Sequence, residues 1–289
     1  MLARQYAKLC DVADFADPEL AALIPDIVPG ADADRPHRKH WEFARGAMFL
    51  REMQRLEGAD ILDVGAGSEA ILYWLARYAR RVVGVDIYGE GGFADREAVS
   101  SVVTDPAAFA PYPYPKDRLE LLYMDARQLD FPSASFDADV SFSSIEHFGS
   151  PSDIARAASE IGRVLRPGGV AFITTETFLH LHPLDRAPVM LAVRALTLGR
   201  RCASVTLRRR AIDGFTEREL ERRIIIPSGL RLAQPIDTAL SPTARNNPIV
   251  VSPHGGFRAP SGREYPHTFI KANLSTFTSV GLPFVKPRV

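Results

Sequence analysis

Short apolar runs alternate with segments of helical period through the middle of this 289-residue chain. Each run is too short for a helix and apolar on both faces, which is typical of a strand that is buried on both sides. Strands of this kind, separated by helices, indicate a parallel sheet wrapped by helices. The expected strands are 61–64, 81–87, 119–123, 136–142 and 169–175, and the helices expected between them include 70–78 and 151–165.

The two ends of the chain depart from this alternation. Residues 1–57 read as helical, and Gly58 stops the last helix. Near the C-terminus, 267–274 and 276–285 have the composition of two strands joined by a short turn at Ser275, which indicates an antiparallel pair. The sequence therefore predicts a mostly parallel sheet that closes with an antiparallel C-terminal hairpin.

Two segments do not fit the strand–helix rhythm, namely 88–118 and 178–213. We expect both to be insertions over the carboxyl edge of the sheet, where open α/β folds bind their ligands. We expect a single domain made of a helical arm (1–57), a core (58–177), the cap-like insertion 178–213 and a C-terminal part (214–289).

Composition narrows the class of protein. The 35 Lys and Arg residues balance the 35 Asp and Glu residues, so no net field favours a nucleic acid, and no nucleic-acid partner is expected. Cys10 and Cys202 are too few for a disulfide scaffold or a Cys-based zinc site. No window approaches the roughly 18 apolar residues of a transmembrane helix, and the N-terminal residues lack the apolar core of a signal peptide. These features favour a cytoplasmic protein.

The strongest local signal is the loop DVGAGSEA, residues 63–70, after the first expected strand. Its glycines let the backbone approach a ligand, and the helix that follows offers free N–H groups. Gly65, Gly67 and Ala70 fit the dinucleotide fingerprint, with Asp86 placed about 20 residues further on for a ribose. By itself this pattern leaves open NAD, another adenosine cofactor, or an ordinary tight turn.

An acidic residue and three further segments accompany the loop. Asp63 precedes the first glycine by two residues, and a carboxylate there suits a positively charged sulfonium and amino group better than a pyrophosphate. The segments 124–132, 135–148 and 163–169 follow in order. With them the chain resembles the class I S-adenosylmethionine-dependent methyltransferases, whose adenine-binding, fourth-strand and pre-fifth-strand signatures they match. The resemblance covers residues 58–177.

The resemblance implies a three-layer α/β/α Rossmann-like fold with S-adenosyl-L-methionine as the cofactor. It implies that Gly65 and Gly67 line the methionine part of the cofactor, with Asp63 near its amino group. Asp86 would accept hydrogen bonds from the ribose hydroxyls. The remaining implied contacts are those of Asp125 and Ala126 with adenine and of Ser143 with the methionine moiety.

The activity implied by the resemblance is methyl transfer to a small-molecule or glycan acceptor, which we expect to be O-methylation. His147 is the candidate general base, because it follows the fourth strand and histidine titrates near neutral pH. Glu146 would orient it or contact the substrate; alternatively, His147 only packs at the strand end. The family's third glycine is replaced by Glu69, which either reaches a ligand or is an acid stabilised at a helix N-terminus.

Several weaker patterns leave alternatives open. His180 and His182 could ligate a metal, but a histidine pair in a Pro-containing loop is more often incidental, and no metal is expected. The insertion 178–213 carries a basic cluster that either binds an anionic acceptor or is solvated, namely Arg200, Arg201, Arg208, Arg209 and Arg210. An NAD(P)-dependent oxidoreductase and a non-catalytic binding protein remain the alternative functions.

A finer resemblance concerns residues 37–42, 87–97 and 110–114. They are similar to a bacterial subgroup associated with surface polysaccharides and sugar modification. Within the first of these segments, Trp41 and Glu42 either close the cofactor pocket or serve as a packing tryptophan and a solvated acid.

Overall fold

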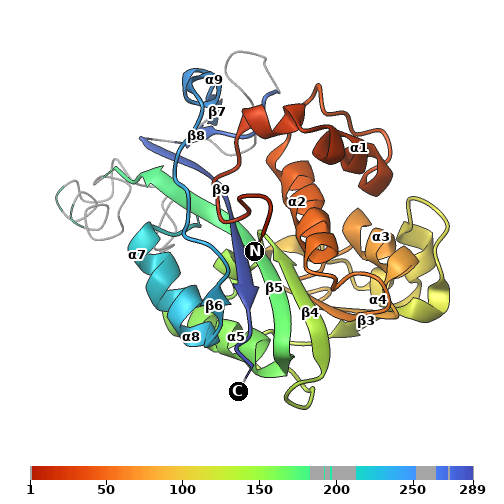
Figure 1. Cartoon of the computed structure of the whole chain (residues 1–289). Coiled ribbons are helices and arrows are strands. Elements are labelled where there is room, and N and C mark those ends of the chain that lie inside the picture. The colour runs from red at the N-terminus through yellow and green to blue at the C-terminus, as the bar shows by residue number, and fades with distance from the viewer. Residues whose placement is uncertain are drawn as a thin grey trace.

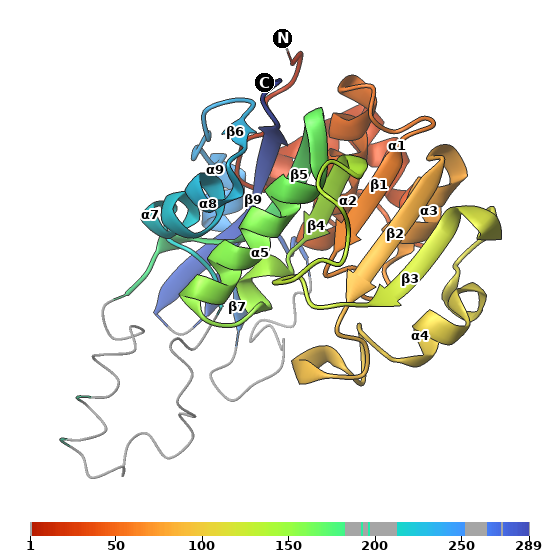
Figure 2. The same ribbon diagram turned by 90° about the horizontal axis from the view of Figure 1, so that it is seen from below.

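The structure is a computed structural model that describes residues 2–182, 213–251, 265–272 and 274–288, together with residues 192 and 196. Within these ranges a nine-stranded sheet has the order β3-β2-β1-β4-β5-β9-β8-β7, and β6 pairs with β9 beside this path. Helices cover both faces of the sheet (Figures 1 and 2). The predicted α/β/α architecture is therefore confirmed.

The parallel half of the sheet contains the apolar runs seen in the sequence. Its strands are β1 (Asp60–Val64), β2 (Arg81–Asp86), β3 (Leu119–Tyr123), β4 (Phe136–Phe142) and β5 (Leu165–His180). Within this half, neighbouring strands pair in parallel. β5 extends beyond the expected 169–175 at both ends, because Leu165 pairs with Phe136 of β4 and the residues up to His180 pair with β9.

The C-terminal strands form the other half of the sheet. β9 (Ser275–Val285) is antiparallel to β5 and to β8 (Ile270–Ala272), so the predicted hairpin is confirmed. Its first strand is shorter than the expected 267–274. The short strands β6 (Arg231–Leu232) and β7 (Ile249–Val251) were not expected, because so few residues carry no readable alternation.

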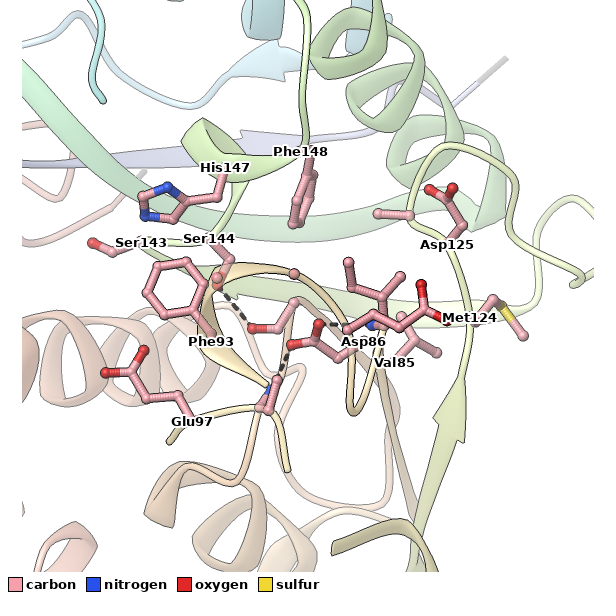
Figure 3. Close-up of a pocket in the computed structure, with 18 of the residues that line it drawn as sticks. Val85, Asp86, Phe93, Glu97, Met124, Asp125, Ser143, Ser144, His147 and Phe148 are labelled. Atoms are coloured by element: carbon pink, nitrogen blue, oxygen red, sulfur yellow. Dashed lines mark hydrogen bonds between the residues drawn. The ribbon is translucent and has the colours of Figure 1, made fainter. Parts of the chain in front are cut away.

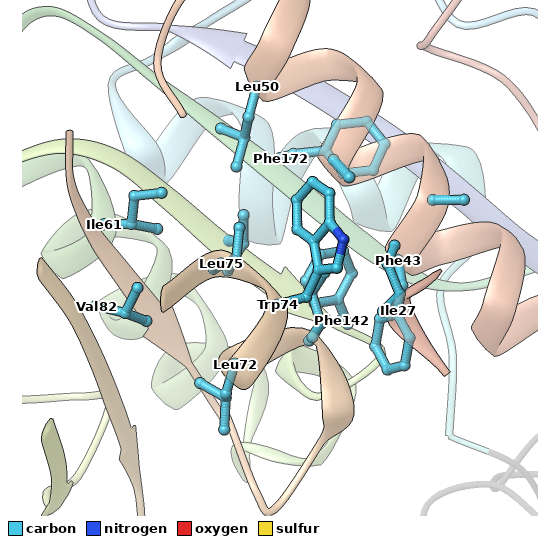
Figure 4. Packing of buried hydrophobic residues seen from close by; sticks show 14 of the residues in the cluster. Ile27, Phe43, Leu50, Ile61, Leu72, Trp74, Leu75, Val82, Phe142 and Phe172 are labelled. Atoms are coloured by element: carbon cyan, nitrogen blue, oxygen red, sulfur yellow. The ribbon is translucent and has the colours of Figure 1, made fainter. Parts of the chain in front are cut away.

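One face of the sheet is covered by the helices of the first half of the chain. They are α1 (Pro18–Ile27), α2 (Arg38–Glu52), α3 (Ala70–Tyr78) and α4 (Ser101–Thr104). Figure 4 shows members of the buried cluster between these helices and the sheet, among them Trp74 of α3, Phe43 of α2 and Phe142 of β4; the rings of Phe43 and Phe142 lie 5.2 Å apart. This packing gives the arm residues of α2 fixed positions above the carboxyl ends of β4 and β5.

The other face is covered by α5 and the C-terminal helices. They are α5 (Pro151–Val164), α7 (Glu217–Leu220), a π-helical turn (Glu221–Ile225), α8 (Ile226–Ser228) and α9 (Pro242–Asn246). Ser150 begins α5 with a capping box. The sequence also predicts one continuous helix over residues 216–226, and the π-helical turn interrupts it. Gly162 of α5 lets α8 approach, since a Cβ there would lie 1.8 Å from the carbonyl oxygen of Ser228.

Short 3-10 turns complete the described structure: Val12–Ala16, Gly91–Phe93, Pro106–Phe109, Lys116–Arg118 and Ile145–His147. The expectation of a helical arm over 1–57 is wrong for residues 2–11, which are not helical. Here Leu9 forms a bridge with Val280, and the Cys10 N–H donates to the Ser279 carbonyl at 2.8 Å. The edge of β9 thus supplies hydrogen bonds that a local helix would otherwise provide.

Two further expectations concern membrane-spanning helices and the insertion 178–213. No helix in the described ranges is both long and apolar enough to cross a membrane. Most of the insertion 178–213, including its arginine cluster, lies outside the described residues, so its role as a cap stays a prediction.

Candidate active site

A cavity of about 290 Å³ lies at the carboxyl edge of the parallel strands. Its wall is made by the loops that follow β1, β2, β3 and β4 and by the segment 87–98, as expected for an insertion at this edge. The residues predicted from the sequence that line it are Gly65, Gly67, Asp86, Asp125, Ala126, Ser143 and His147.

The two ends of the cavity differ in chemistry. In Figure 3, Ser143, His147 and Phe93 lie at one end, Met124 and Asp125 lie at the other, and Asp86 lies between them. This order matches the order of parts in a cofactor that joins an amino acid to a nucleoside.

The glycine loop needs both of its glycines. Gly65 and Gly67 have φ values of +76° and +49°, which side chains rarely adopt. A Cβ on Gly65 would lie 2.4 Å from the Cβ of Ser144, and one on Gly67 would lie 2.7 Å from the carbonyl oxygen of Glu97. Both positions therefore require glycine, and the turn 65–67, here called the glycine cradle, packs against Ser144 and Glu97 in the cavity wall.

Asp86 ends β2 and holds this loop. Its carboxylate accepts hydrogen bonds from the N–H of Gly67 at 2.9 Å and of Ile87 at 2.7 Å. Burial raises the pKa of Asp86, against these two hydrogen bonds, which lower it. Each carboxylate oxygen keeps a second lone pair for a ligand hydroxyl.

Asp125 and Ala126 lie after β3 at the opposite end of the cavity. Both oxygens of Asp125 accept from the guanidinium of Arg127, with the Nε at 2.8 and 2.9 Å. The hydrogen bonds from Arg127 are the main cause that lowers the pKa of Asp125. This carboxylate therefore stays ionised and is held in place by its neighbour.

Asp63 is the one expected cofactor residue outside the cavity wall. Its side chain is 1% exposed, and both carboxylate oxygens lack a hydrogen-bond partner among the described residues. Burial raises the pKa of Asp63 well above its usual value. Its placement next to the cofactor's amino group stays a prediction.

The arm contributes a residue that the sequence pattern did not single out. Lys39 of α2 lines the cavity, and its Nζ lies 2.6 Å from the Oε1 of Glu69 and from the carbonyl oxygen of Phe142. Burial raises the pKa of Glu69 to about 7, although the Lys39 ammonium opposes this shift. No local signal marks Lys39, because α2 meets the glycine loop only in the folded chain.

Trp41 and Glu42, on the same helix as Lys39, are both buried but have different contacts. Trp41 is fully buried, and its Nε1–H donates to Asp14 at 2.7 Å, so it packs in the core. Glu42 is also fully buried and not solvated. It accepts a hydrogen bond from the hydroxyl of Ser143 at 2.8 Å and so fixes one cavity-lining side chain.

The candidate catalytic pair lies on the 3-10 turn after β4. The ring Nδ1 of His147 lies 3.2 Å from the Oδ2 of Asp213, and Phe93 packs against the ring. Burial lowers the pKa of His147, but the hydrogen bond to Asp213 and the charges of Glu146 and Asp213 raise it more. Glu146 does not line the cavity; it is buried and accepts from the Thr175 hydroxyl at 2.7 Å.

Comparison with known proteins identifies the domain around this cavity. Residues 62–173 match the model of a methyltransferase domain. A Mycolicibacterium smegmatis protein named "probable S-adenosylmethionine-dependent methyltransferase" is 32% identical over 52% of this chain and 51% of its own length. A Mycobacterium tuberculosis protein of the same description is 28% identical over 61% of this chain and 56% of its own length.

Two further proteins, one of them with a solved structure, are similar to this chain. A phosphatidylethanolamine N-methyltransferase of Cereibacter sphaeroides is 32% identical over 49% of this chain and 63% of its length. A solved S-adenosylmethionine-dependent methyltransferase from Methanosarcina mazei is 18% identical, with a TM-score of 0.46, over 82% of this chain and 96% of its own.

The chain spans about half the length of the first curated relatives that it matches. The shared region includes the glycine loop, Asp86, Asp125 and the turn that carries His147. The glycine cradle and the carboxylates along the cavity fit an adenosine cofactor that carries a cationic amino-acid part. With this fold, residues 62–173 of the chain are similar to the methyltransferase domain family.

Proposed function

We propose that this protein transfers a methyl group from S-adenosylmethionine to the oxygen of a small-molecule or glycan acceptor in the cytoplasm. The observation that carries the proposal is the convergence of Gly65, Gly67, Asp86, Asp125, Ala126 and Ser143 on one cavity. Four separate loops supply these residues, so chance clustering does not account for their meeting.

When bound, the cofactor supplies a methyl group on a sulfonium, whose carbon–sulfur bond breaks with both electrons going to sulfur as the acceptor oxygen bonds to the carbon. The chain's own part is to bind and align the reactants, since alignment contributes most of the rate in such a displacement. Asp86 accepts from the ribose hydroxyls, and Asp125 with Ala126 holds the adenine. Gly65 and Gly67 admit the methionine part.

His147 is the proposed proton acceptor for the attacking hydroxyl. It lines the cavity beside Ser143, and Asp213 fixes its Nδ1, which leaves the other ring nitrogen for the acceptor's proton. Glu146 adds a negative charge close to the ring. This arrangement is a base held by a carboxylate, as in other general-base pairs.

We expect His147→Gln to lower turnover about a hundredfold while leaving cofactor affinity unchanged, because the variant removes only the titratable ring. The acidic limb of the pH–rate profile should also flatten. Initial rates between pH 5 and 9, with calorimetric binding of S-adenosylhomocysteine as the control, provide the measurement. Turnover within a few-fold of the parent rules out the base role.

The cofactor part of the proposal is tested by binding. S-adenosylhomocysteine should raise the melting temperature of the protein, since a ligand of the folded state stabilises it, and NAD should not. A shift with NAD alone would favour the oxidoreductase. A protein that binds neither compound would support the non-catalytic alternative.

The acceptor part is tested by a screen with labelled cofactor. The acceptors are free sugars, lipid-linked glycans, small alcohols and, as the nitrogen arm, phosphatidylethanolamine, the lipid that appears in the name of one relative. Label in a base-stable ether on a hydroxyl acceptor supports the proposal. Label on the amine instead overturns the choice of oxygen, but not the methyl transfer.

A further inference from the structure

Three side chains next to the cavity offer metal-ligand atoms to one point. Glu146 and His147 come from the 3-10 turn after β4, and Glu176 comes from the neighbouring strand β5. One ligand atom from each lies within 4.8 Å of those of the other two. Glu176 carries no signal in the sequence, because only the pairing of β4 with β5 brings it to this turn.

The two carboxylates are buried and only partly satisfied. Glu146 is 5% exposed and Glu176 is 7% exposed. One oxygen of each has a partner, since Thr175 donates to the Oε2 of Glu146 at 2.7 Å and Arg38 contacts the Oε1 of Glu176 at 2.7 Å. The remaining oxygens, Oε1 of Glu146 and Oε2 of Glu176, have no hydrogen-bond partner in the described part of the chain. Buried carboxylates are costly unless they are paired or bind a cation.

The imidazole of His147 has a carboxylate beside one ring nitrogen, as metal-binding imidazoles usually do. Asp213 lies 3.2 Å from the Nδ1 of His147. Metal-ligating histidines usually direct one ring nitrogen at a carboxylate or a carbonyl, which fixes the tautomer and makes the other nitrogen a better ligand. The same contact that suits a general base therefore also suits a ligand.

The local charge balance leaves room for a cation. Arg38 is shared, because its guanidinium also contacts the Oε1 of Glu42 at 3.3 Å. Lys39 lies closer to Glu69, at 2.6 Å, than to Glu42, at 3.9 Å. Among the described residues, Glu42 and Glu176 thus share the guanidinium of Arg38, and Glu146 forms no ion pair with a lysine or arginine.

From this geometry we propose that Glu146, His147 and Glu176 bind one divalent first-row transition-metal ion. Two carboxylates and one imidazole form a donor set that suits ions such as Mn²⁺ and Zn²⁺. Three protein ligands leave at least one coordination position open, as in catalytic rather than structural sites. An acceptor in the adjoining cavity, which His147 lines, would take the open position.

The inference rests on the proposed methyl transfer and changes the role of one residue. In the ion-bound protein His147 is a ligand, and the ion makes the acceptor hydroxyl acidic by coordinating its oxygen. The hydroxyl proton leaves to solvent, the oxygen bonds to the methyl carbon, and the sulfur keeps the electron pair of the broken bond. The base role of His147 then belongs to the ion-free protein only.

The test measures metal binding directly, without cofactor or acceptor. Chelator-treated protein is titrated with Mn²⁺ and, separately, with Zn²⁺ in a calorimeter. One equivalent should bind to the parent. Asp213→Asn, which removes the carboxylate beside the Nδ1 of His147, should weaken binding about 10- to 100-fold, and Glu176→Gln, which removes a ligand, should weaken it further.

Glu217→Gln is the matched control, because Glu217 is an exposed carboxylate on α7 outside the triad; it should bind the ion as the parent does. A parent that binds neither ion, or a Glu176→Gln variant with parental affinity, overturns the site. S-adenosylhomocysteine binding is measured on the same samples. A parent protein that does not bind S-adenosylhomocysteine would overturn the proposed function. A parent that binds S-adenosylhomocysteine but no metal ion would overturn only the proposed metal site.

Discussion

At the scale of single residues, Asp86 has two tasks. Its carboxylate accepts hydrogen bonds from the N–H groups of Gly67 and Ile87, and we propose that it also accepts from the ribose hydroxyls of the cofactor. The pattern of an acid at the end of the second strand pointed to the ligand contact. The hydrogen bond to the glycine loop is visible only in the structure, and it means that Asp86 also preorganises the cradle.

Asp86→Ala should therefore weaken S-adenosylhomocysteine binding at least tenfold. Removal of a charged acceptor costs about 1.5–3 kcal/mol, and about 1.4 kcal/mol corresponds to a factor of ten. Isothermal calorimetry measures the affinity, with Asp130→Ala, an exposed aspartate outside the cavity wall, as the control. Equal affinities of the parent and Asp86→Ala would remove Asp86 from the cofactor site.

The charge state of His147 is a second property at this scale. Burial lowers its pKa, but Asp213 and Glu146 raise it overall above its ordinary value of 6.5. Because the folded pKa is raised, the ring's stabilising contribution is complete below the unfolded pKa and is lost as pH rises through the folded pKa.

We expect Asp213→Asn to lower the pKa of His147, since the variant removes the nearest negative charge. A proton NMR titration of the ring in chelator-treated protein between pH 5 and 9 gives both values. Glu217→Gln should leave the titration as it is in the parent. An unchanged pKa in Asp213→Asn would show that the contact seen with Asp213 does not persist in solution.

At the scale of elements, the loop between β1 and α3 depends on close approach as well as on backbone conformation. Gly65 and Gly58 both have positive φ, +76° and +68°. A Cβ on Gly65 would contact Ser144, whereas one on Gly58 would meet nothing within 4 Å. Gly58 is therefore required only by its backbone conformation, whereas Gly65 is required both by its conformation and by the close approach of Ser144.

Gly58→Ala should lower the free energy of unfolding by about 1–2 kcal/mol, the cost of a left-handed backbone for a residue with a side chain. Gly65→Ala should lower it further, because overpacking typically adds about 1–3 kcal/mol, and should also weaken S-adenosylhomocysteine binding. Urea unfolding and calorimetry measure the two effects. Equal losses of stability, with cofactor affinity intact in both variants, would contradict the conclusion that close packing at Gly65 shapes the cofactor-binding loop.

At the scale of the whole molecule, the middle of the sheet buries acids on neighbouring strands. Asp139 of β4 is fully buried, and burial raises its pKa well above its usual value, with the charge of Asp63 adding to the shift. The pKa of Asp137, on the same strand, is shifted in the opposite direction. Burial opposes its ionisation, but the Asp60 N–H and the Arg166 guanidinium lower its pKa.

The two acids should give opposite pH dependences of stability. A raised folded pKa means that the folded chain keeps a proton that the unfolded chain releases above about pH 4, so stability falls as pH rises. Asp139→Asn should therefore gain stability relative to the parent between pH 5 and 8. Asp137→Asn should lose stability at pH 7, and that loss should shrink as pH falls towards 3, because the parent's own stabilisation disappears there. Urea unfolding across this range measures both, and a pH-independent difference for Asp139→Asn would contradict the raised pKa.

The sequence by itself determined the parallel strands, the C-terminal hairpin and the order of the cofactor motifs, because strand burial and tight turns leave local patterns. Tertiary structure alone decided that Lys39 lines the cavity, that Asp63 lies outside its wall and that Glu176 joins Glu146 and His147. It also decided that residues 2–11 are not helical, since β9 supplies their hydrogen bonds. The physical reason is the same in each case: strand pairing and helix packing join residues far apart in the chain, and local periodicity carries no record of those contacts.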